Sequence, residues 1–518
     1  MTKKLFALIL SCMLLIALFA GCSPGGGESS APSKTESSKT SADASKEDSA
    51  STEEPYEVNF LYVVAKEGSN QGKVEQAVSD LAMKELNMKV HLIPMTFGTY
   101  FQQLPLMLAA NEDLDLFPAM SNEFATYIES QYIVNCADYL DEAKDIISVL
   151  GEEEAFTPYI GDFLVGFAQM RERGYPVGLI VRQDLFQELG YKTEDFSVST
   201  DDYNSYQQLT ALFAKVKEAH PNITAVDGSD AIMGLMDNGW VDNLGSLFGV
   251  LEDYGQTTTV TNWFESEQYR TFCEIAREWY QAGYISQDIA VSQDDAIVRM
   301  KAGNCFSFFS YIKPNSAVEK ESQCGYPLEI IPIGKGFKGT NGTNSCVYSI
   351  ANASKDPRKA MKFLNWAYTS QEFMDLLNWG IEGEDWVKNE EGLATYPEGV
   401  DASSVGYHND MGFIYPNQFV NTPWVGNPVD IWEQYKEYNG SMMKSKGYGF
   451  TFDSSVVSTE MAQLNTVYEQ YKKDLAFGVI DIESGLKDFN DALYAAGLQK
   501  VIDEKQKQLN EWLAAKEE

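Results

Sequence analysis

Aromatic residues stand beside amide, hydroxyl or carboxylate side chains at several loop positions of this sequence. They are Trp240 with Asp242, Ser310 with Tyr311, Trp379 with Glu382, Tyr415 with Asn417, and Trp424. Sugar rings present apolar C–H faces and a rim of hydroxyl groups, so flat rings next to hydrogen-bonding side chains are suited to hold them. Core packing is the alternative for each residue. The pattern therefore predicts a carbohydrate site, with Glu382 as the carboxylate to test and Trp240 favoured by its Gly/Asp-rich loop.

Motifs for catalysis or cofactor binding receive little support. Residues 334–339 match the GxGxxG pattern of dinucleotide-binding loops, but 340–343 (TNGT) cannot start the helix that such a loop requires. The three histidines show no paired spacing and the cysteines no CxxC, so a zinc site is not indicated. Among 76 acidic residues a glycosidase-like carboxylate pair can be found at any spacing. We expect no catalytic residue, metal ligand or cofactor, and leave open one disulfide among Cys305, Cys324 and Cys346.

Residues 1–21 have the composition of a lipoprotein signal peptide. A basic start and an apolar run over 5–20 precede the small residues Ala20 and Gly21, where a signal peptidase would cut. Cys22 follows, as in bacterial lipoproteins, whose cysteine thiol takes a diacylglycerol and becomes the mature N-terminus. A plain signal peptide or an anchor helix is the alternative, although a spanning helix needs ~20 apolar residues. We expect lipidation of Cys22, with palmitate, and a place at the extracellular face of the cell membrane.

The segment 22–55 is rich in Ser, Thr, Ala, Lys and Glu and has almost no apolar residue. It cannot bury enough surface to order itself, so we expect a disordered tether that reaches about 30 Å. The whole chain has a formal charge of −37, which argues against nucleic acid, teichoic acid or an anionic bilayer as partner. Contact with the membrane is therefore expected through the lipid anchor only.

Strand and helix patterns alternate after the tether. The segments are 58–64, 73–86, 89–95, 100–110 and 114–117, with the first, third and fifth β-rich and the others helical. This order predicts a parallel sheet with helices on its faces, and ligands of such sheets bind at the carboxyl ends of the strands. The residues expected to contact ligand there are Lys66, Asn70 and Asn122.

Several stretches together carry a resemblance to a known family. They are 100–116 (YFQQLPLMLAANEDLDL), 280–290 (YQAGYISQDIA), 300–304 (MKAGN), 354–368 (SKDPRKAMKFLNWAY), 380–383 (GIEG) and 505–513 (KQKQLNEWL). In order and spacing they resemble the extracellular solute-binding proteins of ABC importers, family 1, and the long lipoprotein branch linked to plant-polysaccharide oligosaccharide uptake in Gram-positive bacteria. Two departures are Asn111, where the family has a Gly-Glu turn, and the acidic pair Glu384-Asp385, where the branch often has a basic or His-containing segment.

The resemblance implies an α/β, two-lobed fold of the periplasmic-binding-protein type II kind, with discontinuous lobes and a hinge. The expected lobes are 56–178 with 327–378 and 179–326 with 379–518, and the expected crossings lie near 177–181, 326–332 and 377–380. Tyr311 matches by position an aromatic residue of the family. The implied function is capture of an oligosaccharide ligand for ABC transporter permease subunits, by a monomer without chemistry of its own.

Three hypotheses remain at this point. The first is the binding protein of an importer, and the second is a lipid-anchored glycoside hydrolase. The third is a surface protein that binds carbohydrate without transport. Release of reducing sugar would separate the second from the first, and saturable binding with lobe closure would favour the first over the third.

Overall fold

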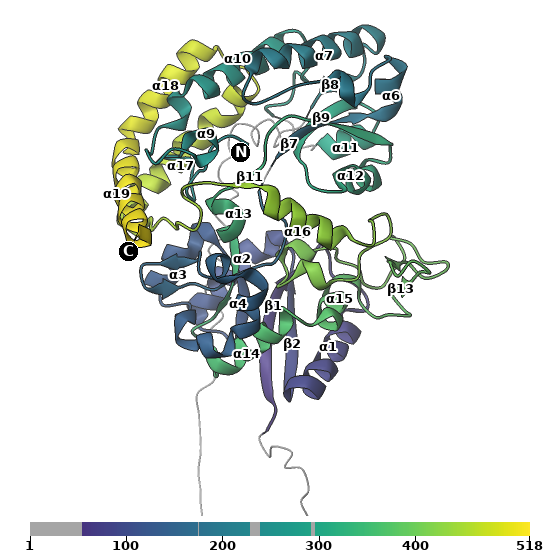
Figure 1. The fold of residues 1–518 in the computed structure, drawn as a ribbon, viewed down its shortest axis with the longest axis vertical. Helices are drawn as coiled ribbons and strands as arrows, with labels where there is room; N and C mark the ends of the chain where they lie inside the picture. The colour runs from purple at the N-terminus through teal and green to yellow at the C-terminus, as the bar shows by residue number, and fades with distance from the viewer. Residues whose placement is uncertain (1–53, 175, 228–238, 292–295, 518) are drawn as a thin grey trace, which may run out of the picture. The chain divides into compact units, whose positions relative to one another are not determined.

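The computed structural model describes residues 54–174, 176–227, 239–291 and 296–517 (Figure 1). The expected signal peptide, Cys22 and nearly all of the tether lie outside these residues. Within the described part of the chain, no helix is long and apolar enough to cross a membrane.

The first lobe is built on a five-stranded sheet with the order β2-β1-β3-β12-β6. Its strands are β1 (Tyr56–Val63), β2 (Met88–Met95), β3 (Leu116–Met120), β6 (Phe167–Ala168) and β12 (Cys346–Ile350). As the alternation of patterns predicts, β1 runs parallel to both β2 and β3. Strand β12 is antiparallel to β3 and β6. The carboxyl ends of β1, β2, β3 and β6 therefore share one edge.

Helices α1 (Gln71–Leu86) and α2 (Phe97–Ala110) connect the first three strands. α1 buries Val74, Val78 and Leu81, a helical spacing that turns one face to the sheet. α2 ends at Asn111, which adopts the left-handed conformation at φ 53°. Asparagine tolerates this conformation better than most residues, which explains how it can stand where the family has a glycine.

The second lobe contains a four-stranded sheet with the order β10-β7-β9-β8. The strands are β7 (Val177–Arg182), β8 (Thr224–Val226), β9 (Cys305–Tyr311) and β10 (Leu328–Pro332). Strand β7 pairs antiparallel with both β9 and β10. Helices α7 (Gln207–Ala219), α10 (Glu267–Gln281), α17 (Ser458–Ala476), α18 (Ile482–Ala495) and α19 (Leu498–Glu517) contribute to its core. The yellow helices α17 and α18 pack beside α10 (Figure 1).

The expected lobe boundaries differ from the structure at two places. β10 was expected in the first lobe, but its backbone pairs with β7 of the second sheet. Tyr407 and Tyr415 were expected in the second lobe, but both are buried in the core of the first. The Tyr415 hydroxyl donates to the carbonyl of Val63 at 2.9 Å, which fixes this late segment against β1.

Three linking segments join the two cores. Among the described residues they run between the last and first buried core residues on either side and comprise 169–176 without residue 175, 338–345 and 416–449. The expected crossing near 377–380 is therefore corrected, because the chain continues in the first core as far as Tyr415. The other two crossings were expected within strands β7 and β10. The linking segments lie beside these strands and take no part in the pairing of β7 with β10.

Five cysteines of the described chain are buried thiols outside any disulfide: Cys136, Cys273, Cys305, Cys324 and Cys346. The disulfide left open for the last three does not form in this structure. Burial raises the pKa of the Cys136 and Cys346 thiols to about 12, so both are unreactive packing residues at neutral pH.

Candidate ligand-binding site

Four aromatic residues of the first lobe meet in one cluster, defined by Trp379, Tyr396, His408 and Trp424. The ring centroid of His408 lies 5.2 Å from that of Trp379 in a stacked arrangement and 4.5 Å from that of Trp424, edge to face. Tyr396 closes the group at 4.8 Å from Trp424. Trp379 is only 4% exposed, whereas Trp424 and His408 are partly exposed. The cluster therefore offers ring surface and a polar atom to a ligand.

His408 is the polar member of this aromatic cluster. Its Nδ1 is buried and finds no hydrogen-bond partner among the described residues. Burial, reinforced by the positive charge of Lys66, lowers the pKa of the imidazole to about 4. The ring is therefore neutral at physiological pH, with one nitrogen a donor and the other an acceptor.

The loop that carries Trp424 is anchored by Asp375 of α15 (Gln371–Trp379). The carboxylate accepts hydrogen bonds from the backbone N and the hydroxyl of Thr422, both at 2.7 Å. The Trp379 indole N–H donates to the carbonyl of Thr422 at 2.9 Å. Since α15 packs in the first core, this network holds the two indoles in a fixed relation.

The carboxyl end of β1 reaches the same region. The Asn70 amide donates to Asp385 at 2.8 Å, and the Asn70 backbone N donates to the carbonyl of Gly406 at 3.0 Å. The Lys66 ammonium donates to the carbonyl of Ala402 at 3.5 Å. Lys66 thus lies close enough to His408 of the aromatic cluster to act on its charge, whereas the Asn70 amide is engaged by the protein itself.

A charged group lies beside the cluster, and it brings residues of both lobes together. The Lys313 ammonium is 3.7 Å from the Glu172 carboxylate and 3.3 Å from that of Glu319. Asp410 interacts electrostatically with Glu319 and Lys313, and also with Tyr396 of the aromatic cluster. This network connects Lys313 of the second lobe, just after β9, with the aromatic cluster.

Asp410 has two properties of a ligand-binding carboxylate. It is exposed to solvent, yet dense surroundings desolvate it and, with Glu319, raise its pKa to about 6. Its backbone adopts φ 52°, a conformation that few non-glycine residues keep without support.

Three of the residues predicted from sequence lie in the cores with their polar groups engaged. Asp242 is 2% exposed and accepts from the backbone N of Thr340 at 3.1 Å. The Tyr415 hydroxyl bonds to β1, and the Asn417 amide donates to the carbonyl of Tyr368 at 2.7 Å. These three residues hold the fold together, so the core alternative describes them better than ligand binding.

The remaining predicted residues occupy separate positions. Trp240 is 8% exposed and packs against Tyr254 in the second core, with a ring centroid distance of 5.1 Å. Tyr311, 37% exposed, ends β9 and pairs with Val177. Glu382 is exposed beside the aromatic cluster on a turn that bridges to Trp386, and Asn122 is exposed at the end of β3.

Sequence reasoning missed His408, Tyr396, Asp410 and Lys313. The first three lie in an irregular loop segment, where no periodic pattern singles out one residue. Lys313 follows the strand that ends at Tyr311, and this proximity was the one available signal.

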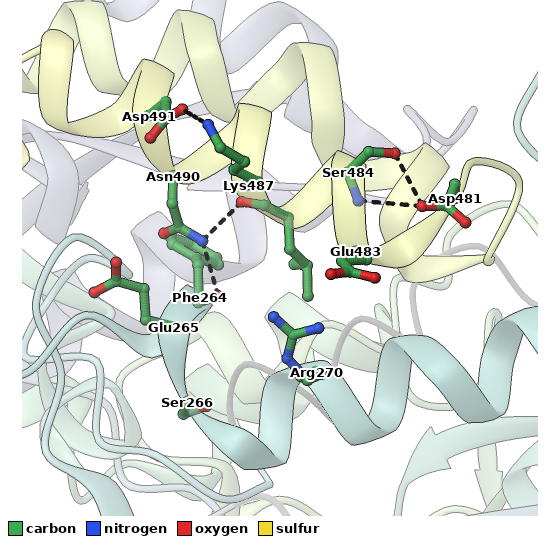
Figure 2. A pocket seen from close by; sticks show the side chains of 11 residues that line it. Phe264, Glu265, Ser266, Arg270, Asp481, Glu483, Ser484, Lys487, Asn490 and Asp491 are labelled. Atoms are coloured by element: carbon green, nitrogen blue, oxygen red, sulfur yellow. Dashed lines mark hydrogen bonds and ion pairs between the residues drawn. The ribbon is translucent and has the colours of Figure 1, made fainter.

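A pocket of about 710 Å³ lies elsewhere, between the start of α10 and α18 (Figure 2). Arg270 points from α10 toward α18, where Glu483 and Lys487 lie. Lys487 pairs with Asp491 at 2.5 Å, and Glu265 accepts from the hydroxyl of Tyr494 at 2.7 Å. None of the predicted ligand-binding residues lines this pocket. In the part of the chain that the structure describes, no group of three His, Cys, Asp or Glu residues is placed to hold a metal ion.

Comparison with known proteins gives two sequence matches. Residues 76–381 match the family described as bacterial extracellular solute-binding protein. Residues 446–514 match a domain of unknown function, DUF3502. A carbohydrate ABC transporter substrate-binding protein of Streptococcus pneumoniae serotype 4 is 22% identical over 468 residues, covering 88% of this chain and 91% of that protein.

Solved structures share the fold. The N-glycan transport solute-binding protein NgtS of Streptococcus pneumoniae superposes with a TM-score of 0.75 at 19% identity, over 89% of this chain and all of that chain. An extracellular solute-binding protein of Bifidobacterium longum subsp. infantis gives a TM-score of 0.62 at 15% identity, over 88% and 98% of the two chains. These likenesses confirm the two-lobed α/β fold, and the sequence match spans more than half of the chain. The chain therefore belongs to the family of bacterial extracellular solute-binding proteins.

Proposed function

We propose that this protein captures an oligosaccharide at the aromatic cluster and delivers it to the permease subunits of an ABC importer. The observation that carries the proposal is the cluster of the Trp379, His408 and Trp424 rings, in which the Nδ1 of a neutral His408 has no partner among the described residues. Stacking surface with a nearby carboxylate, Asp410, is the chemistry that a sugar needs. The pneumococcal relative bears the name of a carbohydrate transporter component, and NgtS was solved with Man1GlcNAc and with Man5GlcNAc.

A thermal-shift panel tests the ligand class. The panel contains neutral plant-type oligosaccharides, mannose-rich GlcNAc oligosaccharides and uronic-acid oligosaccharides. A ligand present at about 100 times its Kd adds roughly 2.7 kcal/mol to the free energy of unfolding, which is a clear rise in Tm. A rise with one glycan class supports the proposal. The absence of any shift across the panel contradicts an oligosaccharide ligand.

Lipid anchoring at Cys22 completes the proposed role. A lipidated N-terminus with a flexible tether keeps the binding lobes close to a permease at high effective concentration. Cys22→Ser should release the protein into the medium and lower uptake while leaving the Kd of the purified protein unchanged. An altered Kd, or continued membrane retention, would contradict this division of labour.

Glycoside hydrolysis is the second candidate because one observation favours it. Asp410, with its raised pKa, interacts with Glu319, whose pKa is lowered despite burial because Lys313 and Lys320 outweigh desolvation. One protonatable and one ionised carboxylate form the pair that glycosidases use. Assay of released reducing ends from any glycan that raises Tm decides between the two: a binding protein leaves the glycan intact, and turnover identifies a hydrolase.

A further inference from the structure

A buried ionic cluster, which we call the hub, connects the first lobe to all three linking segments. At its centre is Glu154 of α5 (Glu152–Ala155), a helix of the first lobe. Its carboxylate accepts from Arg173 Nε at 3.2 Å, Lys338 Nζ at 3.3 Å and the Tyr448 hydroxyl at 2.8 Å. The side chains of Arg173, Lys338 and Glu154 are 1%, 9% and 16% exposed.

Each partner of Glu154 comes from a different linking segment. Arg173 lies on the first, Lys338 on the second and Tyr448 at the end of the third. Within the described residues the two lobes are covalently joined only through these segments, so any rotation of one lobe against the other must bend them. A carboxylate that binds all three is thus placed at the point about which such a rotation occurs.

Backbone contacts fix the segments to one another around the hub. The Asn439 side chain accepts from the backbone N of Arg173 at 2.6 Å and donates to the carbonyl of Arg171 at 2.9 Å. In addition, β11 (Phe337–Lys338) pairs in parallel with β15 (Met443–Lys444). The first segment is therefore bound to the third, and the third to the second.

Close packing at glycines shows how tightly the segments approach. A Cβ at Gly174 would lie 2.2 Å from Met442 Sδ and 2.7 Å from the carbonyl oxygen of Phe337. A Cβ at Gly336 would lie 2.6 Å from Met442 Cε. At Gly174 the backbone carbonyl leaves no room for a side chain, whereas at Gly336 the flexible end of Met442 would have to move. The three segments therefore meet at one compact crossing.

Each of the three nitrogens of the Arg173 guanidinium donates a hydrogen bond in this crossing. Besides Glu154, it donates to the carbonyl of Gly342 in the second segment at 3.3 Å and to that of Gln169 in the first at 2.7 Å. Although burial alone would raise the pKa of Glu154, the charges of Arg173 and Lys338 outweigh it and hold the pKa below its ordinary value. The groups of the hub are therefore ionised, and because they are buried their charges must stay close together to compensate one another.

The DUF3502 segment supplies one side of the crossing. Tyr448 is one of its first residues, and Thr451 donates to the carbonyl of Thr157 in the first lobe at 3.0 Å. Farther along, Lys505 of α19 donates to the carbonyls of Asn243 and Gly249, at 3.1 and 2.8 Å, and so fixes the loop that begins at Asp242. Asp242 in turn accepts from Thr340 of the second linking segment. The segment thus contacts the first lobe and the crossing together.

We infer that Glu154 positions the two lobes for closure by holding the three linking segments together at the point of rotation, which is the pivot. The DUF3502 segment, through Tyr448, forms the fixed side of this pivot. The inference rests on the proposed function, because closure acquires its purpose from a captured ligand. The hub narrows the range of lobe orientations in the unliganded protein. The lobes therefore lose less orientational freedom when they close on a ligand. Glu154 acts without touching the ligand.

The test measures lobe orientation directly. Spin labels are placed at Lys84→Cys on α1 and Glu218→Cys on α7, in the exported chain with Cys22→Ser. The five described native cysteines are buried and so do not compete for the label. Glu154→Gln should broaden the label-to-label distance distribution of the unliganded protein. Tyr448→Phe, which removes one hydroxyl, should broaden it less, and the Kd for a ligand identified by thermal shift should rise about fivefold to tenfold in Glu154→Gln.

Asp115→Asn is the matched control. Asp115 is a carboxylate of the first lobe with 1% exposure that accepts from the Tyr56 hydroxyl at 2.6 Å, away from the linking segments. Its loss should lower stability while leaving the distance distribution and the Kd unchanged. The pivot would be overturned if folded Glu154→Gln and Tyr448→Phe gave label-to-label distance distributions as narrow as that of Asp115→Asn.

The outcomes separate this inference from the proposed function. A broadened distribution in Glu154→Gln, in a protein that binds no glycan, would support the pivot and contradict the proposed ligand. An unchanged distribution in a protein that does bind glycan would contradict the pivot and leave the proposed function standing.

Discussion

At the scale of single residues, the proposed binding site depends on two neighbours in one loop, His408 and Asp410. Their environments move their pKa values in opposite directions, to about 4 and about 6. A sequence shows that both side chains can titrate, but not the burial that shifts them. For the same reason Asp242 and Asn417 were predicted as ligand contacts although they face the cores. Trp379 and Trp424 were each predicted as separate ligand contacts, and their contact with one another in the aromatic cluster was not predicted.

The pKa of Asp410 predicts a pH dependence of binding. Above pH 7 the carboxylate is ionised and accepts hydrogen bonds from ligand hydroxyls, and below pH 6 it is protonated. We expect the affinity to be constant from pH 7 to 8 and to fall by at most about tenfold per pH unit below pH 6. His408 stays neutral over this range, so Asp410→Asn should bind weakly but without pH dependence in calorimetric titrations. A steep pH dependence retained in Asp410→Asn would contradict this assignment.

The same residue predicts an opposite effect on stability. Its folded pKa of about 6 lies above the value near 3.9 of an unfolded chain, so the folded state binds the proton first. Ionisation of Asp410 therefore costs stability above pH 6. Asp410→Asn should raise Tm at pH 7.5 by about 2 °C, and this gain should vanish below pH 4. A lower Tm at pH 7.5 would show that the carboxylate supports the fold instead.

Lys505 gives a stability prediction for the DUF3502 segment. Its fully buried ammonium donates to the Asn243, Ser246 and Gly249 carbonyls. Lys505→Met fills the space but leaves these carbonyls without a donor, so it should lower the free energy of unfolding by about 3 kcal/mol in urea. Lys507→Met, two positions along on an exposed side of the same helix, should change it by less than about 0.5 kcal/mol. Equal effects of the two variants would contradict the role of Lys505.

At the scale of elements, the first three strands were predictable because each is a local apolar run. Strands β1 and β2 agree closely with the segments 58–64 and 89–95. The pairing of β12 with β3 joins residues more than 220 positions apart, and no local pattern carries such a partner choice. The pairing of β10 with β7 was missed for the same reason, which displaced the expected lobe boundary.

The end of α2 provides an element-scale test. Asn111 holds a left-handed φ of 53° and its backbone N donates to the carbonyl of Leu108 at 3.1 Å. Asn111→Ala should lower the free energy of unfolding by about 1 kcal/mol, because alanine pays a steric cost in this conformation. Asn111→Gly should equal or exceed the wild type. Urea unfolding of both variants measures the difference, and an alanine variant as stable as the glycine variant would contradict the cap.

At the scale of the whole molecule, two lobes could be predicted from the resemblance, and the family match and fold comparisons confirm them. The position of the third linking segment could not, because residues up to Tyr415 return to the first core through contacts with β1. This return brings Trp379, His408 and Trp424 together. The late loops of the chain thus complete the site at the carboxyl edge of the first sheet.

The central claim, that an oligosaccharide binds at this cluster, is tested most directly by calorimetric titration of two tryptophan variants. The titrant is the glycan that raises Tm most. Trp424 and Trp512 are both partly exposed, but Trp512 lies on α19, packed against Phe450. The wild type should bind one glycan with a Kd near micromolar, Trp424→Ala about 30-fold more weakly, and Trp512→Ala as the wild type does. Undiminished binding by folded Trp424→Ala would contradict the claim.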